Sequence, residues 1–446
     1  MNFKEWKLWV STLTWERKWF VYLVLLRPVI DVFYALQNIS PFLSPLFIVG
    51  GLTPVLVYAS IQSGRMGDYR RVFQDNCFMV LSIILLLNFI LIGFRWVYFP
   101  LFHVGIKSMI VPLVYFYLRR FIRSEQDVVG VFATFLFSTL FPLAQLVYEN
   151  VFGQLSPGQM ARGELRFEGL YADVLSYSTY INFSFLCTAF FFMLAERNPA
   201  KKKKATMWFV GIFFVCLVAM LSIKHAASWG VFLALILLIM FYSLNPRSLI
   251  TAVVAVLVVG GGLFFARESI QQNVENAFGT DIAVFSGEID KERGLHGRMT
   301  IWTKYYERWQ RSSILAKMFG SGFWGDSNPL IGRLDTGMAL VMLSGGMHSD
   351  YVRLFYGCGI VGLVCYILFL LSVLATSFRT ERTFKFIIIG CVGSMMLYSI
   401  STTPLIYASA SYFPAAIFAY AALVQERRKF GQHGGMPGMW GPGPRR

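Results

Sequence analysis

Charged residues are scarce in this chain, and acidic residues are scarcer than basic ones. Only 14% of the 446 residues are Asp, Glu, Lys or Arg, whereas 56% are hydrophobic. Because so few charges cannot cover the surface of a soluble protein with this much apolar sequence, a soluble globular protein is excluded. The composition predicts an all-α integral membrane protein with many spans.

Cysteine and histidine are also few, with six and five residues. No group of them has the spacing of metal ligands, so we expect chemistry that uses neither a metal nor another cofactor. All six cysteines fall in or beside apolar segments, where we expect inert packing residues. They are Cys77, Cys187, Cys216, Cys358, Cys365 and Cys391.

The N-terminus lacks the signal of a cleaved leader, because no short apolar segment there ends in small residues. The first 18 residues instead place Trp6, Trp9 and Trp15 among charges, which predicts an interfacial segment before a retained first span. The sequence also lacks the internal repeat from which many transporters are built.

Twelve apolar segments are long enough to cross the roughly 30 Å of a bilayer's hydrocarbon core. Lys and Arg gather in alternate connections, including Lys201 to Lys204, which predicts that both termini are cytoplasmic. The net charge of +16 is spread over these short connections, so anionic membrane lipid is the expected partner and nucleic acid is rejected. The segments lie near residues 19–37, 44–61, 77–94, 97–118, 128–148, 173–194, 206–223, 226–243, 248–266, 352–373, 385–401 and 404–423.

Two longer connections, 149–172 and 267–351, lie on the predicted outer side, and function is expected there. The second contains a helix-like segment with Trp302, Tyr305 or Tyr306, and Trp309 on one face. A face that packs within the loop is favoured over a direct substrate contact. Residues 1–429 would form the membrane domain, and residues 430–446 a disordered cytoplasmic tail.

Charged residues within predicted spans are costly unless they face a cavity or a partner. Arg27 and Asp31 lie one helical turn apart, so we expect them to pair. His103 and Lys107 have the same spacing and could line a cavity open to the outside. The charged residues within the predicted spans or their tight turns are Arg27, Asp31, Lys107, Lys224 and Arg353.

His348 stands between the polar connection 267–351 and the next apolar segment. Because the pKa of imidazole lies nearest neutrality, a histidine at a water-accessible membrane surface can take a proton from a hydroxyl nucleophile. We therefore predict that His348 serves a transferase there, the alternative being a structural histidine at a helix start. Asp350 is expected to cap the following helix rather than to orient His348.

Four blocks of sequence carry motif-like patterns: RFEGLYAD at 166–173, LSIKHAASWGVFLAL at 221–235, GRMTIWTKYYERWQRSSILAKMFGSGFW at 297–324 and HSDYVRLFYGCGIVGL at 348–363. In this order they resemble the signatures of the O-antigen ligase and O-antigen polymerase superfamily of bacterial envelope glycosyltransferases. The matching patterns are Arg-x-x-Gly, Ser-x-x-Arg-Gly, Arg-x-x-x-Trp with Gly-x-Gly, and His-Asn-x-x-Leu with Gly-x-x-Gly. The chain departs at Ser349, where Asn is usual, and at Lys224 and His225, where Arg and Gly are common.

The resemblance implies transfer of a glycan from undecaprenyl diphosphate to a sugar hydroxyl at the outer face of the bacterial inner membrane. In such a reaction His348 would act as the catalytic base. Arg166, Arg298 and Arg353 would bind the donor's diphosphate, with Lys224 a weaker candidate. A salt bridge within the loop is the alternative for Arg298.

The resemblance does not choose the acceptor, which is either a growing glycan or lipid A core. The two outer connections slightly favour a polymerase of O-antigen or exopolysaccharide repeat units, with which a chain-length regulator is a compatible partner. An O-antigen ligase is the alternative within the superfamily. A lipid or sugar transporter is the alternative of a different class. Long connections on one side of the membrane only, however, suit chemistry at that surface better than alternating access.

Overall fold

The computed structural model describes most of the chain. The described residues are 1–38, 45–62, 69–95, 99–153, 155, 159–161, 164–166, 170–171, 174–196, 199–223, 225–242, 298–320, 349–405 and 412–430. Some predictions concern residues outside these ranges. They are the predictions for the ninth apolar segment near 248–266, for Lys224, for His348 and for residues 431–446 of the tail.

The described chain is built almost entirely from helices. Its one sheet is a short antiparallel hairpin, in which β1 (Gln159–Ala161) pairs with β2 (Glu164–Arg166). The helices are α1 (Phe3–Thr12), α2 (Trp15–Val32), η1 (Phe33–Asn38), α3 (Pro45–Gln62), α4 (Phe73–Arg95), α5 (Phe99–Phe121), α6 (Glu125–Ser138), α7 (Leu140–Phe152), α8 (Val174–Glu196), α9 (Pro199–Ile223), α10 (Ala226–Tyr242), α14 (Arg298–Arg311), α15 (Ile314–Phe319), α17 (Asp350–Ser377), α18 (Arg382–Ser401) and α19 (Tyr412–Lys429).

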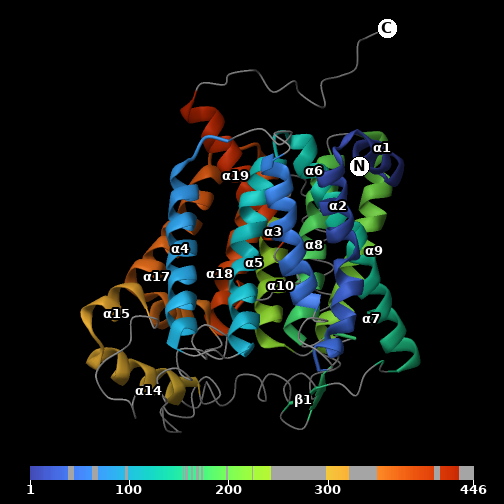
Figure 1. The fold of residues 1–446 in the computed structure, drawn as a ribbon. Helices are drawn as coiled ribbons and strands as arrows, with labels where there is room; N and C mark the ends of the chain where they lie inside the picture. The colour runs from blue at the N-terminus through green and yellow to red at the C-terminus, as the bar shows by residue number, and fades with distance from the viewer. Residues whose placement is uncertain are drawn as a thin grey trace.

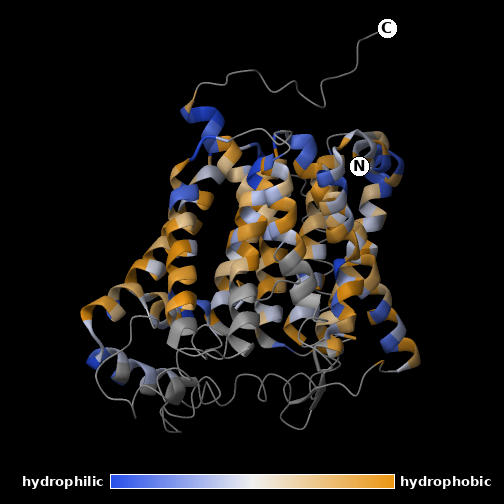
Figure 2. Cartoon of the chain, in the orientation of Figure 1, coloured by the Kyte–Doolittle hydropathy of each residue, from blue (hydrophilic) through white to orange (hydrophobic). Residues whose placement is uncertain are grey.

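The long helices run side by side in one bundle (Figure 1). We call the end that carries α1 and the last turn of α19 the α1 end, and the end that carries the β1–β2 hairpin and α14 the hairpin end. Hydrophobic residues fill the middle of the bundle, and hydrophilic residues gather most densely at the α1 end (Figure 2). Such a banded surface is typical of a helical membrane protein.

Six described helical segments are long and apolar enough to cross a membrane. A described helix overlaps every apolar segment that the sequence predicts except 248–266, which is not described. The chain therefore has the architecture of a helical membrane protein. The six segments are Phe73–Leu91, Glu125–Phe152, Val174–Glu196, Ala200–Ile223, Asp350–Ser377 and Arg382–Ile400.

The segment predicted as one span near 128–148 is two helices, α6 and α7, which meet at Thr139. Proline in the first turn of a helix lacks a backbone donor and favours a helix start, and Pro142 occupies that turn of α7. The Thr139 hydroxyl lies 3.0 Å from the hydroxyl of Ser184 on α8. The break is thus held against the centre of the bundle.

Helix α8 occupies the centre, because nearly all of its residues from Val174 to Met193 are buried. A helix that is buried on every side must satisfy its polar side chains inside the protein. Tyr180, Asn182 and Ser184 all bond to residues outside α8, although Oδ1 of Asn182 has no hydrogen-bond partner among the described residues.

At the α1 end, a buried ion network joins three helices. Arg119 of α5 donates from Nε to Oδ1 of Asp75 on α4 at 2.8 Å, and from Nη2 to Oε2 of Glu426 on α19 at 3.1 Å. The Tyr115 hydroxyl also donates to Oδ1 of Asp75, at 2.6 Å. Since removing one partner of a buried ion pair leaves an uncompensated charge, this network fixes the relative positions of the three helices.

Helix α1 lies at the same end and begins with a capping box formed by Asn2 and Glu5. Trp6 donates from its indole Nε1 to the Thr134 hydroxyl of α6 at 2.8 Å, and the Trp9 ring covers Gly130 so closely that a Cβ atom there would lie 2.4 Å from it. Two of the three tryptophans that predict an interfacial segment, Trp6 and Trp9, therefore anchor α1 on α6.

Candidate active site at the hairpin end

The hairpin end brings the described parts of all four motif blocks to one side of the bundle. Arg166 belongs to β2, Ala226 begins α10, Arg298 begins α14, and Asp350 begins α17. Figure 1 shows the hairpin and α14 at this end, opposite α1. The structure describes the backbone but not the side chains of Arg166 and Arg298.

The start of α17 is fixed by a buried hydrogen-bond network. The Ser349 side chain caps the helix by accepting from the backbone of Val352, so the prediction that Asp350 is the cap is wrong. Asp350 instead accepts from the Leu405 backbone at 2.9 Å and from Nε of Arg353 at 3.0 Å. A Ser side chain can cap as well as Asp, which leaves the buried carboxylate to hold a guanidinium.

Arg353 is only 2% exposed, and its pairing with Asp350 uses Nε. Its Nη1 has no hydrogen-bond partner among the described residues. Burying a charged donor without an acceptor is costly. The sequence predicts Arg353 as a diphosphate ligand. Its Nη1 could donate a hydrogen bond to such a ligand near the start of α17, the helix that follows His348.

The third and fourth motif blocks pack directly on one another. Helix α17 is kinked at Gly359, whose φ of 70° is in the left-handed region. A Cβ atom on Gly359 would lie 2.4 Å from the carbonyl group of Met318, and one on Gly320 would lie 2.1 Å from the carbonyl oxygen of Gly357. The glycines at these positions thus allow α15 to seat against the kink.

Helix α15 is held from α4 as well. Asn88 donates from Nδ2 to the carbonyl oxygen of Phe319 at 2.7 Å and to that of Ile84 at 2.8 Å. The amide therefore joins the last residue of α15 to α4, the helix against which α17 packs. Helix α15 is therefore held by α4 on one side and by α17 on the other.

The aromatic face of α14 is a packing face, as the sequence favours, but it packs mainly on the first turns of α17 rather than within the loop. The Trp309 and Phe355 ring centroids are 4.8 Å apart, and the Tyr356 hydroxyl donates to the carbonyl oxygen of Trp302 at 3.3 Å. Tyr305 is buried in the same small cluster, whereas Tyr306 is 45% exposed. The face serves to dock α14, so Arg298 at its start is brought to the same end of the bundle as the start of α17.

A second polar network begins at the turn between α9 and α10. Nδ1 of His225 lies 2.7 Å from the Ser228 hydroxyl, which donates to the hydroxyl of Ser178 at 2.6 Å. Asn182 donates from Nδ2 to the Ser228 carbonyl at 3.0 Å and to the Tyr398 hydroxyl at 2.6 Å. His225 is thus a positioned residue of the second motif block.

Arg27 and Asp31 pair at 2.8 Å, which confirms the expectation from their spacing. The Tyr180 hydroxyl donates to Oδ2 of Asp31 at 2.9 Å. Nε and Nη1 of Arg27 and the hydroxyl of Tyr171 have no hydrogen-bond partner among the described residues. Burial, and then the charge of Asp31, raise the pKa of Tyr171 well above its ordinary range, so its phenol remains a donor.

These networks share helices. Tyr180 contacts the Arg27 pair while Ser178 and Asn182, on the same helix α8, belong to the His225 network. On α18, Tyr398 belongs to the His225 network and the adjacent Ser399 accepts through its carbonyl from the Ser349 hydroxyl at 2.9 Å. We call these neighbouring networks together the polar floor of the hairpin end. The sequence reveals its charged members but not its tyrosines and serines.

The cysteines take no part in this floor, and its His and Asp side chains are not grouped as metal ligands. All six cysteines are free, and only Cys365 is more than slightly exposed. Within the described ranges, no group of three His, Cys, Asp or Glu side chains is placed to hold a metal ion. Most hydroxyls of the floor are hydrogen-bonded within the protein, whereas Arg27 and Arg353 keep nitrogen atoms without a partner among the described residues, and guanidinium groups suit binding of phosphate.

The chain matches no protein-family model and no curated protein sequence. The likeness to the O-antigen ligase and polymerase superfamily therefore stays a prediction from the four blocks. Its consequences for function depend on the geometry of the hairpin end.

Proposed function

We propose that the chain is a membrane glycosyltransferase that moves a glycan from undecaprenyl diphosphate to a sugar hydroxyl. The acceptor oxygen attacks the anomeric carbon of the donor, and the bond from that carbon to the diphosphate oxygen breaks. The acceptor's proton passes to His348, and the diphosphate leaves with the electron pair. The step needs no metal and no other cofactor.

The observation that carries this proposal is the direct packing of Gly320 on Gly357. It joins the block that contains Arg298 to the block that begins with His348, as a common site requires. The β2 strand with Arg166 and the turn before α10 lie at the same end. A shared active site requires that all four segments lie at one end of the bundle, and this placement supports the proposal.

Each candidate residue has a role that matches its chemistry. His348 is the base, because imidazole titrates near neutral pH. Arg166, Arg298 and Arg353 bind the diphosphate, since guanidinium groups bind phosphate oxygens in pairs and keep their charge near lipid. Lys224 is a further cation for the same group.

The proposal includes a membrane topology, which gives the number of spans and the side on which each terminus lies. Twelve spans place both termini in the cytoplasm, because the basic connection with Lys201 to Lys204 lies beside α1. The hairpin end then faces the periplasm, with the connections 149–172 and 267–351. The protein is a multi-pass component of the bacterial inner membrane with a cytoplasmic tail at 430–446.

Polymerisation of O-antigen or exopolysaccharide repeat units is the form of the reaction that we favour, with a glycan as the acceptor. The ligase alternative uses the same donor and site but lipid A core as the acceptor. The buried Arg27 and Asp31 pair is the observation that favours a lipid or sugar transporter, because intramembrane charges often line transport pathways.

The chain lengths of lipid-linked and surface glycans test the proposal in a strain that lacks this protein. The native chain should restore long polymers, whereas His348→Ala should leave single repeat units at an equal amount of membrane-inserted protein. Long chains that accumulate on undecaprenyl diphosphate without reaching their acceptor would identify a ligase. Repeat units that accumulate on the cytoplasmic side would contradict the enzyme and favour a transporter.

A further inference from the structure

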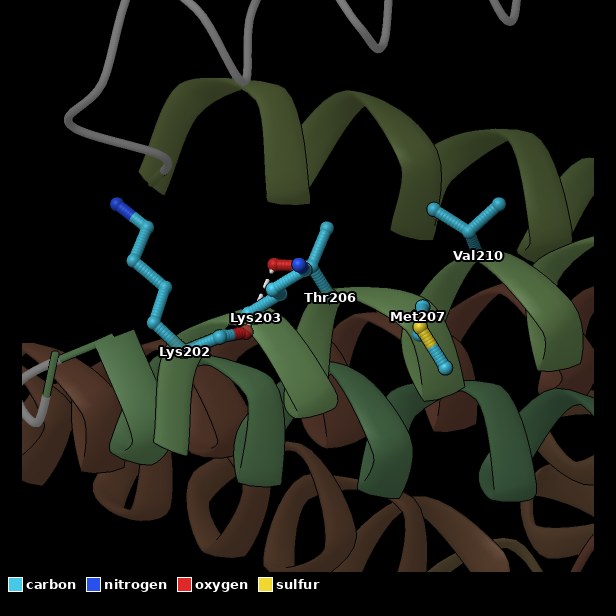
Figure 3. Close-up of a pocket in the computed structure, with 5 residues that line it drawn as sticks. All are labelled: Lys202, Lys203, Thr206, Met207 and Val210. Carbon is cyan, nitrogen blue, oxygen red and sulfur yellow. Dashed lines mark hydrogen bonds between the residues drawn. The ribbon is translucent and has the colours of Figure 1, made fainter. Parts of the chain in front are cut away.

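A groove lies along α9 near the α1 end, far from the candidate active site. Its described lining comes from one face of the helix, and the open hollow has a volume of about 590 Å³. Figure 3 shows Lys202, Thr206 and Val210 on the side of α9 that faces a neighbouring helix. The lining residues are Lys202, Lys203, Thr206, Met207 and Val210.

The groove changes from cationic to apolar along its length. Lys202 and Lys203 stand at its mouth, in the first turn of α9, and Val210 lies roughly 10 Å further along the helix axis. The Thr206 hydroxyl donates to the carbonyl oxygen of Lys202 at 2.9 Å, so it is already satisfied. Met207 is 68% exposed, which is unusual for so apolar a side chain unless lipid covers it.

The lysines of this segment do not all face the groove. Lys201 and Lys204 are exposed but do not line it, and Nζ of Lys201 lies 3.6 Å from Oε1 of Glu5 on α1. Glu196 interacts electrostatically with Lys202, but it also interacts with Arg382. The mouth of the groove therefore keeps a positive charge.

We infer that this groove binds a phospholipid with an anionic headgroup. Lys202 and Lys203 contact the phosphate, and Met207 and Val210 contact an acyl chain. The cytoplasmic leaflet of a membrane carries anionic lipids. Lysine can place its ammonium group at the depth of the headgroups while its methylene groups lie along an apolar surface. A free phosphate would use the lysines but not the apolar wall, so the shape of the lining selects a lipid.

The test measures binding of dioleoyl-phosphatidylglycerol to purified full-length protein by native mass spectrometry, with dioleoyl-phosphatidylcholine as the neutral probe. Lys202→Ala/Lys203→Ala removes the groove lysines, and Lys201→Ala/Lys204→Ala removes the same charge from the opposite face. Met207→Trp fills the apolar part without changing charge. We expect the phosphatidylglycerol affinity of the groove pair to be on the order of tenfold lower than that of the control pair.

Met207→Trp should also weaken phosphatidylglycerol binding while the protein keeps its unfolding temperature. Equal losses in the two lysine pairs would overturn the inference, because they would show attraction to surface charge alone. Unchanged binding in every variant would also overturn it.

Discussion

Gly320 packs so closely on Gly357 that a Cβ atom on Gly320 would lie 2.1 Å from the carbonyl oxygen of Gly357. The contact seats α15 on α17 and unites two motif blocks that are far apart in the sequence. It makes the geometry of the candidate active site depend on glycine at this position.

We predict that Gly320→Ala lowers the unfolding temperature and glycan transfer together. Gly320 has a φ of 105°, and backbone stands where the new methyl group would be, so a cost of about 2 kcal/mol or more is expected. Thermal unfolding in detergent measures the loss. Gly211→Ala in α9 is the control, because no atom lies within 4 Å of its Cβ position and Ala favours a helix. Equal unfolding temperatures in the two variants would contradict the packing argument.

Asp350→Asn should destabilise the protein strongly, because it leaves the guanidinium of Arg353 buried without its counter-charge. Loss of one member of a buried pair costs on the order of 3–5 kcal/mol. Adding Arg353→Met should recover much of this stability, since the unpaired charge is then removed. Unfolding temperatures measure both changes. Transfer activity should stay low in the double variant if Arg353 binds diphosphate, and full activity there would show a structural role only.

Tyr180→Phe should cost about 1.5–3 kcal/mol, because its hydroxyl donates to the charged Asp31 carboxylate at 2.9 Å. Tyr177→Phe is a matched control on the same helix. Its hydroxyl donates to the neutral carbonyl of Pro142 at 3.1 Å, so about 0.5–1.5 kcal/mol is expected. Urea or thermal unfolding compares the two variants, and a larger loss at Tyr177 would show that the Asp31 bond contributes little.

The sequence predicts those features that depend on neighbours along the chain. Apolar length locates the helices, and a four-residue spacing predicts the pairing of Arg27 with Asp31. The three-to-four-residue spacing of Trp302, Tyr305 and Trp309 predicts the packed face of α14. Each of these signals is local.

The features that the sequence does not predict depend on distant contacts. Tyr180 reaches Asp31 from another helix, and Gly320 meets Gly357 only after the helices have packed. The Asp350 interpretation is wrong for the same reason, since Leu405 and Arg353 compete for its carboxylate once they are buried beside it. A cap preference is a local tendency that tertiary contacts override.

The most direct test of the transferase is release of undecaprenyl diphosphate by purified protein supplied with an undecaprenyl-diphosphate-linked repeat unit and an acceptor glycan, in the presence of a chelator. The account predicts that the native chain releases the lipid diphosphate and lengthens the acceptor in equal amounts. It also predicts that the His348→Ala variant, with an unfolding temperature equal to that of the native chain, does neither at a measurable rate. Native activity in His348→Ala would contradict the assignment of the base, and no release by the native chain would contradict the transferase itself.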